Sequence, residues 1–317
     1  MNSLWQVAIT EVASKNYSAI IDVRSPAEFA QDHMPGAINC PVLSDAERAQ
    51  VGTLYKQVSP FEARKVGAAL IARNIARHIE AQFQNHPKHW RPLVYCWRGG
   101  QRSGAMQIIL RQIGWPADRL VGGYKAFRHH VIAQTAQRAP ALRWRMLCGA
   151  TGSGKTRILQ ALAAQGAQVL DLETLAAHKG SVLGSWPHTP QPSQKAFETA
   201  VWQKIQEFDV ARPVFAEAES RKIGQLQIPP PLLQAMRLGA CIDVEATLPA
   251  RTAFLLHDYA YVQQTPELLI AQLERLKERQ GSATVAEWLA LAREHKWSAL
   301  IQALLQRHYD PHYRQSQ

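Results

Sequence analysis

Residues 149–156 read Gly149-Ala-Thr-Gly-Ser-Gly-Lys-Thr156. They match Gly-x4-Gly-Lys-Ser/Thr, the phosphate-binding loop that joins a strand to a helix in α/β proteins. The chain supplies both neighbours, because residues 143–148 (Arg143-Trp-Arg-Met-Leu-Cys148) are strand-like and residues 157–165 have a helical pattern. We therefore predict a parallel α/β domain built around this loop.

The side chains and amides of this loop predict how a phosphate would be held. The backbone N–H groups that would wrap it belong to Gly149, Gly152, Ser153 and Gly154. Lys155 would neutralise the phosphate charge, and the Thr156 hydroxyl could ligate Mg²⁺. The motif predicts a diphosphate and leaves its bearer open, ATP being only the commonest.

An acidic metal ligand or acid/base group is expected at the end of a neighbouring strand. The candidates are Asp171, after the strand-like residues 168–170, and Glu217 and Glu219, after residues 213–216. Each could instead be a solvated strand end or an ion-pair partner of Arg221.

Strand-like and helical segments predict two domains. The polar stretch 134–140 precedes the strand before the phosphate loop, so we place a boundary there, giving domains 1–138 and 139–317. In the second domain, strand-like segments at 168–170, 213–216 and 241–244 alternate with helical ones, the pattern of a parallel sheet with crossovers. From about residue 248 to 317 the apolar periodicity is helical throughout.

A second motif lies in the first domain and reads Cys96-Trp-Arg-Gly-Gly-Gln-Arg102. A strand-like run precedes it and a helical pattern, 103–113, follows it. The glycines let the backbone amides turn inward, and the helix adds its positive end, making a nest for an anion or an anionic sulfur. We predict Cys96 as a nucleophile and Arg102 as a bidentate oxyanion ligand, a role that Arg98 could share. The alternative is a buried cysteine that only packs.

Composition and charge limit the class of protein. No apolar run approaches the roughly 20 residues of a membrane helix, and residues 1–6 show no export signal, so a soluble cytoplasmic protein is expected. The other cysteines, Cys40, Cys148 and Cys241, are taken as structural, without a disulfide framework. The net charge of +11 suggests a polyanionic partner, and residues 1–140 hold 17 Lys and Arg against 9 Asp and Glu. A basic helix face within 61–83 is either a solvated surface or an RNA contact.

Two further stretches of the first domain resemble a known fold. Residues 21–39 (Ile21-Asp-Val-Arg-Ser-Pro-Ala-Glu-Phe-Ala-Gln-Asp-His-Met-Pro-Gly-Ala-Ile-Asn39) are similar to the N-terminal signature of rhodanese domains, and Val121-Gly-Gly-Tyr-Lys-Ala-Phe127 resembles their closing signature. Rhodaneses carry sulfur as a cysteine persulfide. The Cys-x5-Arg loop is one residue longer than the common sulfur-carrying loop and resembles that of rhodanese-fold phosphatases and arsenate reductases, which take tetrahedral oxyanions.

A rhodanese domain followed by a phosphate-loop domain resembles the tRNA 2-selenouridine synthase family across most of the chain. The matching segments are residues 47–56, the loop ending at Ser103, residues 178–184 and Glu217-x-Glu-Ser-Arg221. Small departures are Ala177 for a common Asn, Lys179 for Arg, and Gln101 for an aliphatic residue or Met.

The resemblance implies a two-step reaction on the wobble 2-thiouridine of certain tRNAs. The sulfur first attacks C1 of geranyl diphosphate, whose diphosphate the phosphate loop would hold. Cys96 then takes selenium from selenophosphate as S-selanylcysteine, and the selenium displaces geranylthiolate at C2. The implied partners are tRNA, selenophosphate and geranyl diphosphate; no tightly bound cofactor or membrane is expected, and Mg²⁺ is possible.

Two other functions remain compatible with the motifs. One is an ATP-dependent tRNA sulfurtransferase, in which the second domain activates a base oxygen and Cys96 carries persulfide. The other is a rhodanese-like phosphatase or anion sensor with a regulatory NTP-binding module.

Overall fold

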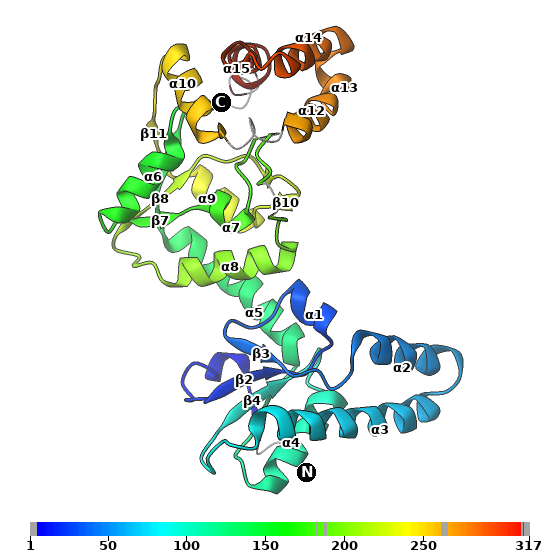
Figure 1. Ribbon diagram of the computed structural model, residues 1–317. Helices are drawn as coiled ribbons and strands as arrows, with labels where there is room; N and C mark the ends of the chain where they lie inside the picture. Colours follow the sequence, from blue (N-terminus) through cyan, green and yellow to red (C-terminus); the bar gives the residue numbers. More distant parts are fainter. Residues whose placement is uncertain (1–4, 182, 187–188, 261–265, 312, 314–317) are drawn as a thin grey trace. The chain divides into compact units, whose positions relative to one another are not determined.

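The computed structural model describes residues 5–181, 183–186, 189–260, 266–311 and 313 (Figure 1). The chain divides into two compact units, Met1–Gln134 and Thr135–Gln317, and helix α5 (Gly123–Arg138) contains the division. None of the helices in the described part of the chain is both long and apolar enough to span a membrane. Each unit is described by itself below.

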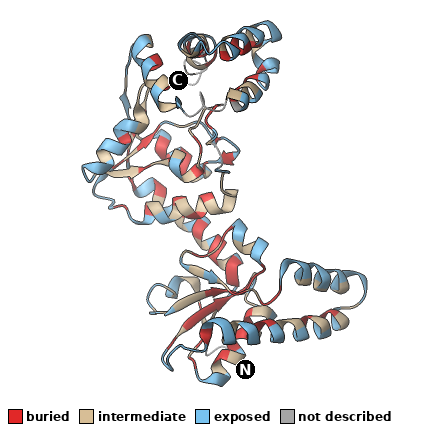
Figure 2. Ribbon diagram, viewed as in Figure 1, coloured by how far each residue is buried: buried red, intermediate tan, exposed pale blue. Residues whose placement is uncertain are grey.

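The first unit is built on a five-stranded parallel sheet of order β1-β5-β4-β2-β3. Its strands are β1 (Gln6–Val7), β2 (Ala19–Asp22), β3 (Ala37–Asn39), β4 (Pro92–Tyr95) and β5 (Asp118–Leu120). All four residues of the central strand β4 are buried, so both of its faces are covered (Figure 2). The strand predicted directly before the cysteine loop is β4 and is therefore confirmed.

The α-helices found among the described residues of this unit lie in it in whole or in part. They are α1 (Pro26–Gln31), α2 (Asp45–Gln57), α3 (Pro60–His78), α4 (Gln101–Ile113) and α5. Serine caps start several of them: Ser44 accepts a hydrogen bond from the Glu47 amide, and the Glu47 carboxylate accepts one from the Ser44 amide. The helix predicted over 61–83 is α3 continued by a π-helical turn, Ile79–Phe83.

The second unit contains a four-stranded parallel sheet of order β11-β6-β8-β7. Its strands are β6 (Arg143–Cys148), β7 (Gln168–Leu170), β8 (Pro213–Glu217) and β11 (Ala240–Asp243), and β9 (Lys222–Ile223) with β10 (Leu226–Gln227) forms a separate antiparallel pair. The strands β6 and β8 end side by side, with Leu147 opposite Glu217. The predicted parallel sheet is therefore confirmed, and its carboxyl edge carries the phosphate loop.

Helices connect and cover this sheet. They are α6 (Lys155–Ala164), α7 (Leu172–Ala176), α8 (Gln194–Gln206), α9 (Pro230–Arg237) and α10 (Leu248–Asp258). Apolar side chains from the sheet, α8 and α9 form one core, which includes Trp144, Phe197 and Leu232.

The C-terminal part is helical, as expected. It consists of α12 (Pro266–Glu274), α13 (Lys277–Gln280), α14 (Ser282–Arg293) and α15 (Trp297–Leu304), followed by a π-helical turn, Leu305–Tyr309. These helices have their own core, centred on the fully buried Trp288 and completed by side chains such as Leu273 and Leu300. The fold class predicted from the sequence is confirmed for both units.

Candidate active site

The cysteine loop, residues 96–102, joins the end of β4 to the start of α4. Cys96 directly follows β4 and is only 3% exposed. Helix α4 begins at Gln101, so its N-terminal amides lie behind the loop. The strand-loop-helix arrangement that the motif predicted is present.

Two groups donate hydrogen bonds to the Cys96 sulfur. The Gly100 amide lies 3.3 Å from Sγ, and the buried Ser103 hydroxyl lies 3.1 Å from it. Both donors would stabilise negative charge that develops on this sulfur in a reaction, because hydrogen bonds to a charged acceptor are the stronger ones. Ser103 follows the Cys-x5-Arg motif directly, and sequence reasoning quoted it without giving it a role.

The closing signature around residues 121–127 packs against this loop. Gly123 has φ +56°, and a Cβ there would lie 2.2 Å from the Cys96 carbonyl oxygen. The Tyr124 amide donates to that same oxygen at 2.8 Å. Only a glycine permits this approach, so the backbone of the closing signature fixes the position of the nucleophile.

Arg102 is held by a carboxylate. Its guanidinium donates to both oxygens of Glu28, at 2.8 and 3.4 Å, and Arg48 contacts Glu28 Oε2 at 2.9 Å. Burial would raise the pKa of Glu28, but the hydrogen bond and charge of Arg102, with the charge of Arg48, lower it below its ordinary value. Glu28 thus stays ionised and orients Arg102, a function for which the sequence held no signal beyond the rhodanese-like segment.

Arg98 is more accessible to solvent than Arg102 is. Its side chain is exposed, whereas Arg102 is half-buried. Arg98 is therefore available to a ligand that approaches the loop from solvent.

The N-terminal signature contributes a buried support beneath these elements. Arg24 is 1% exposed and pairs with Asp22 at 2.6 Å. Its guanidinium lies 3.8 Å from the ring centroid of Tyr124, whose hydroxyl donates to Asp32 at 2.7 Å. Through these contacts the N-terminal signature connects β2 to the closing signature, which in turn fixes the position of the cysteine loop.

The phosphate loop, residues 149–156, follows β6 and precedes α6. Its glycines Gly149, Gly152 and Gly154 have φ of +152°, +84° and +84°. A Cβ on Gly149 would lie 2.5 Å from the Val244 carbonyl oxygen, so the loop closes tightly on the neighbouring chain.

Two polar groups of this loop are poised for an anion. Lys155 Nζ donates to the loop's own Gly149 carbonyl at 2.8 Å. The Ser153 hydroxyl is buried without a hydrogen-bond partner among the described residues. A bound phosphate would give Ser153 a partner and draw Lys155 from the carbonyl to a stronger, charged acceptor.

Three carboxylates gather beside the loop. Oxygens of Glu173, Glu217 and Glu219 lie within 4.8 Å of one another. Thr156 donates to Glu173 Oε2 at 3.4 Å, and Glu217 Oε1 is buried with no partner in the part of the chain described here. We call these three residues the carboxylate cluster.

Burial and mutual repulsion shift the pKa values of the cluster. Burial, followed by the charge of Glu217, raises the pKa of Glu173 to about 9 and that of Glu219 to about 8. Burial also raises the pKa of Glu217. A group of hard oxygen donors that repel one another fits a divalent cation such as Mg²⁺, which would sit next to Thr156 and any phosphate in the loop.

The structure places the three sequence candidates differently. Glu217 ends β8 and Glu219 follows it, both within the cluster. Asp171 instead caps α7, accepting hydrogen bonds from the Thr174 amide at 2.9 Å and its hydroxyl at 2.8 Å, and it acts on the cluster through its charge. No ion pair to Arg221 is found among the described residues.

Glu173 is the cluster member that sequence reasoning missed. It lies two residues past Asp171, in α7 rather than at the strand end. Gly180, within the segment 178–184, lies close to this residue. A Cβ at position 180 would lie 2.7 Å from Glu173 Oε1 and 3.1 Å from Glu219 Oε1. The glycine lets the chain cross the carboxylates closely.

Arg251 fastens the phosphate loop to α10. It is 7% exposed, donates to the Thr151 carbonyl at 2.8 Å, and donates through both terminal nitrogens to Asp310. The α10 helix and the C-terminal turn are therefore coupled to the loop.

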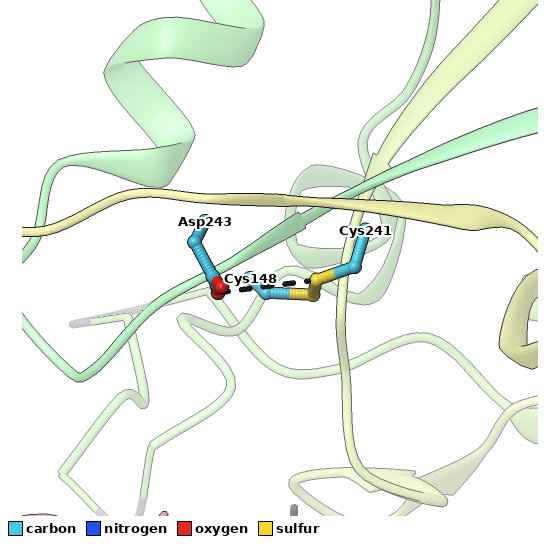
Figure 3. A group of neighbouring side chains, drawn as sticks. All are labelled: Cys148, Cys241 and Asp243. Atoms are coloured by element: carbon cyan, nitrogen blue, oxygen red, sulfur yellow. Dashed lines mark hydrogen bonds between the residues drawn. A yellow bond between two sulfur atoms is a disulfide. The ribbon is translucent and has the colours of Figure 1, made fainter.

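A disulfide joins Cys148, the residue before the loop, to Cys241 in β11, where the sequence analysis expected none (Figure 3). The two strands are neighbours in the sheet, and the Cα atoms are 6.0 Å apart. Asp243 lies beside the pair, with Oδ1 4.0 Å from Cys241 Sγ. A separation of 93 residues hid this contact from the sequence.

Comparisons with known proteins match both units. Residues 6–130 match the family model of the rhodanese-like domain, and residues 142–317 match that of the tRNA 2-selenouridine synthase AAA domain.

Curated relatives agree with this. The tRNA 2-selenouridine synthase of Nitrosomonas europaea is 35% identical over 82% of this chain, and that of Bdellovibrio bacteriovorus is 37% identical over 76%. The chain spans 66% and 64% of those two proteins, slightly under two thirds of each. The synthase of Marinobacter nauticus is 32% identical over 93% of this chain and 87% of its own length. The chain belongs to the tRNA 2-selenouridine synthase family.

Proposed function

We propose that this chain converts the wobble 2-thiouridine of tRNA to 2-selenouridine in two steps, S-geranylation followed by selenium transfer. The observation that carries the proposal is the presence, in one chain of this family, of a hydrogen-bonded buried cysteine and a phosphate loop backed by carboxylates. Each step uses one of these centres.

In the first step, the thiouridine sulfur forms a bond to C1 of geranyl diphosphate while the C1–O bond breaks and diphosphate leaves. The phosphate-loop amides, Lys155 and a cation on the carboxylate cluster would take up the charge of the leaving diphosphate. Preorganised donors of this kind lower the barrier because they need no rearrangement as charge develops.

In the second step, Cys96 acts as the nucleophile toward selenophosphate. As a selenium carrier Cys96 would become S-selanylcysteine, whose selenium is two electrons more oxidised than that of selenophosphate. This route needs an external disulfide to accept two electrons and an external thiol to return them when Cys96 releases selenium. A second route needs neither: Cys96 attacks phosphorus, the P–Se bond breaks, hydrogen selenide displaces geranylthiolate from C2, and water hydrolyses the phosphocysteine. Either route would use the Cys-x5-Arg loop, in which Glu28 orients the Arg102 guanidinium.

The two routes leave different atoms on Cys96. Intact-peptide mass spectrometry of the quenched enzyme separates them, because selenium has a broad isotope pattern and phosphorus has a single isotope. The carrier route predicts a selenium pattern on the Cys96 peptide, and the phosphocysteine route predicts its absence.

The proposal as a whole is tested by incubating the protein with thiolated tRNA, Mg²⁺ and geranyl diphosphate, without ATP. We expect S-geranylated tRNA by nucleoside mass spectrometry, and we expect Lys155→Ala to abolish it. A wild-type protein that forms no such product, or forms a modified base only with ATP, would favour the sulfurtransferase instead.

A further inference from the structure

An apolar cavity adjoins the phosphate loop. Its volume is about 70 Å³, and its walls come from α10, α12 and α15, with Thr151 of the loop at one end. The buried wall residues include Leu255, Leu269, Leu300 and Leu304.

The cavity and the phosphate-loop pocket share part of their lining. The shared residues are Thr151, Ser181, Leu255, Tyr259 and Tyr309. Leu255 packs directly on the loop, because a Cβ on Gly152 would lie 3.0 Å from its Cγ and Cδ1. A molecule whose diphosphate lies in the loop can therefore extend into the cavity without leaving the protein.

The residues that line the cavity indicate which kind of ligand it can bind. Among the described residues that line the cavity, none carries a formal charge, and most are aliphatic side chains or Trp297. The hydroxyl-bearing residues of the lining are Thr151, Ser181, Tyr259 and Tyr309, and all four also line the phosphate-loop pocket. Beyond these hydroxyls the cavity offers a nucleoside no hydrogen-bond partner for its polar edges, so its burial there is disfavoured. A hydrocarbon has no polar edges to leave unpaired, and its affinity increases with each methylene removed from water.

We propose that this cavity holds the prenyl chain of the prenyl diphosphate whose diphosphate occupies the phosphate loop. The inference rests on the proposed function and adds to it the place of the chain and a limit on its length. A cavity of about 70 Å³ is smaller than the roughly 150 Å³ that accommodates a benzene ring. The distal part of the chain fills it, and the part next to C1 lies along Leu255, Tyr259 and Tyr309 in the wider pocket.

The test compares a non-reactive prenyl ligand with its head group alone. We would titrate the full-length chain, in Mg²⁺, with geranyl thiolodiphosphate and with inorganic diphosphate by calorimetry. Burial of two or more methylenes predicts that the prenyl ligand binds at least about tenfold more tightly. Equal affinities for the two ligands in the wild-type protein would overturn the inference.

Variants locate the chain. Ile301→Trp narrows the cavity and should reduce the prenyl advantage, the ratio of the affinity for the prenyl ligand to that for inorganic diphosphate, to less than about threefold. The affinity for inorganic diphosphate should stay intact, which also reports correct folding.

Trp297→Ala widens the cavity and should shift the preference from the geranyl toward the farnesyl ligand. The matched control is Leu238→Trp, at a side chain that is 84% exposed and outside both pockets, and it should change neither affinity. A full prenyl advantage in Ile301→Trp contradicts the inference.

The same proteins separate this inference from the proposed function. If the prenyl advantage depends on Ile301 but no geranyl group reaches thiolated tRNA, the cavity assignment stands and the proposed first step fails. If the group is transferred and Ile301→Trp alters neither binding nor transfer, the reverse holds. A gain for adenosine diphosphate over inorganic diphosphate that Ile301→Trp removes would assign the cavity to a nucleoside and overturn the inference.

Discussion

At the scale of residues, the environment of each cysteine sets its chemistry. The Cys96 sulfur accepts hydrogen bonds from an amide and from the Ser103 hydroxyl. Burial raises the pKa of Cys40 to about 12, so Cys40 remains a neutral thiol near pH 7. Two buried cysteines in one unit thus differ in the donors that surround them. The motif distinguishes Cys96 from Cys40 as the candidate nucleophile, which stays a prediction. Ser103 and Glu28 could be assigned only from the fold, because spacing along the chain does not specify hydrogen-bond geometry.

Ser103 provides the first prediction. Ser103→Ala removes one of the two hydrogen bonds that the Cys96 sulfur accepts from the described residues. A hydrogen bond to charge that develops on this sulfur during the reaction, worth about 1.5–3 kcal/mol, predicts a loss of about tenfold or more in selenium transfer. Geranylation should be unaffected, Ser103→Thr should restore the rate, and Cys40→Ala is the matched control. The readout is the rate of 2-selenouridine formation from S-geranylated tRNA. An unchanged rate in Ser103→Ala would show that the hydroxyl does not act on Cys96.

At the scale of elements, the ends of strands and helices assemble the second centre. The phosphate loop and Glu217 could be predicted from the sequence because they adjoin apolar strands. Glu173 could not, because the turn after β7 and the start of α7 decide which of two nearby acids faces the loop, and Asp171 was used as the cap. The Cys148–Cys241 pair was equally hidden, since only sheet order makes β6 and β11 neighbours.

The carboxylate cluster predicts a pH-dependent response to cations. Glu173 and Glu219 have folded-state pKa values of about 9 and 8, above the ordinary 4.5. The folded state therefore binds more protons than the unfolded state between about pH 4.5 and 9. Without a cation, the free energy of unfolding should fall as the pH rises through that window. Mg²⁺ replaces the protons, so it should raise the melting temperature more at pH 8.5 than at pH 6.5.

Substitutions test this assignment. Glu217→Gln should abolish most of the Mg²⁺-dependent shift in melting temperature, whereas Glu207→Gln, at an exposed position on the same unit, should leave it unchanged. Thermal scans with and without Mg²⁺ provide the measurement. A shift equal at both pH values, or insensitive to Glu217, would argue against a cation at the cluster.

The disulfide predicts a thiol count. The structure contains two free cysteines, Cys40 and Cys96. Alkylation of the denatured, unreduced protein should therefore label two cysteines, and prior reduction should raise the number to all four in the sequence. Peptide mass spectrometry identifies them. Labelling of Cys148 and Cys241 without reduction would show that the pair is not bonded.

At the scale of the whole molecule, the excess positive charge predicts where tRNA binds. Residues 1–140 carry 17 basic against 9 acidic side chains, and Arg64, Arg73 and Arg77 on α3 are exposed. The sequence left open whether this helix face is merely solvated, because charge alone does not identify a ligand.

Replacing Arg64 and Arg73 with Gln should weaken tRNA binding and flatten the dependence of log K on log salt concentration by nearly two units. The matched control replaces Arg293 and Lys296, also exposed, in the C-terminal helical part. Filter binding at several salt concentrations provides both quantities. Equal effects of the two double variants would mean that α3 does not contact tRNA.

The two-domain organisation and both loops were predictable because short motifs between a strand and a helix are local, whereas the cluster, the disulfide and the cavity depend on contacts between distant segments.

The central claim is that the two loops serve successive steps, and the Cys96→Ser protein tests it most directly. Supplied with thiolated tRNA, geranyl diphosphate and selenophosphate, it should accumulate S-geranylated tRNA and form no 2-selenouridine, as measured by nucleoside mass spectrometry. Formation of 2-selenouridine at the wild-type rate by Cys96→Ser would contradict the account.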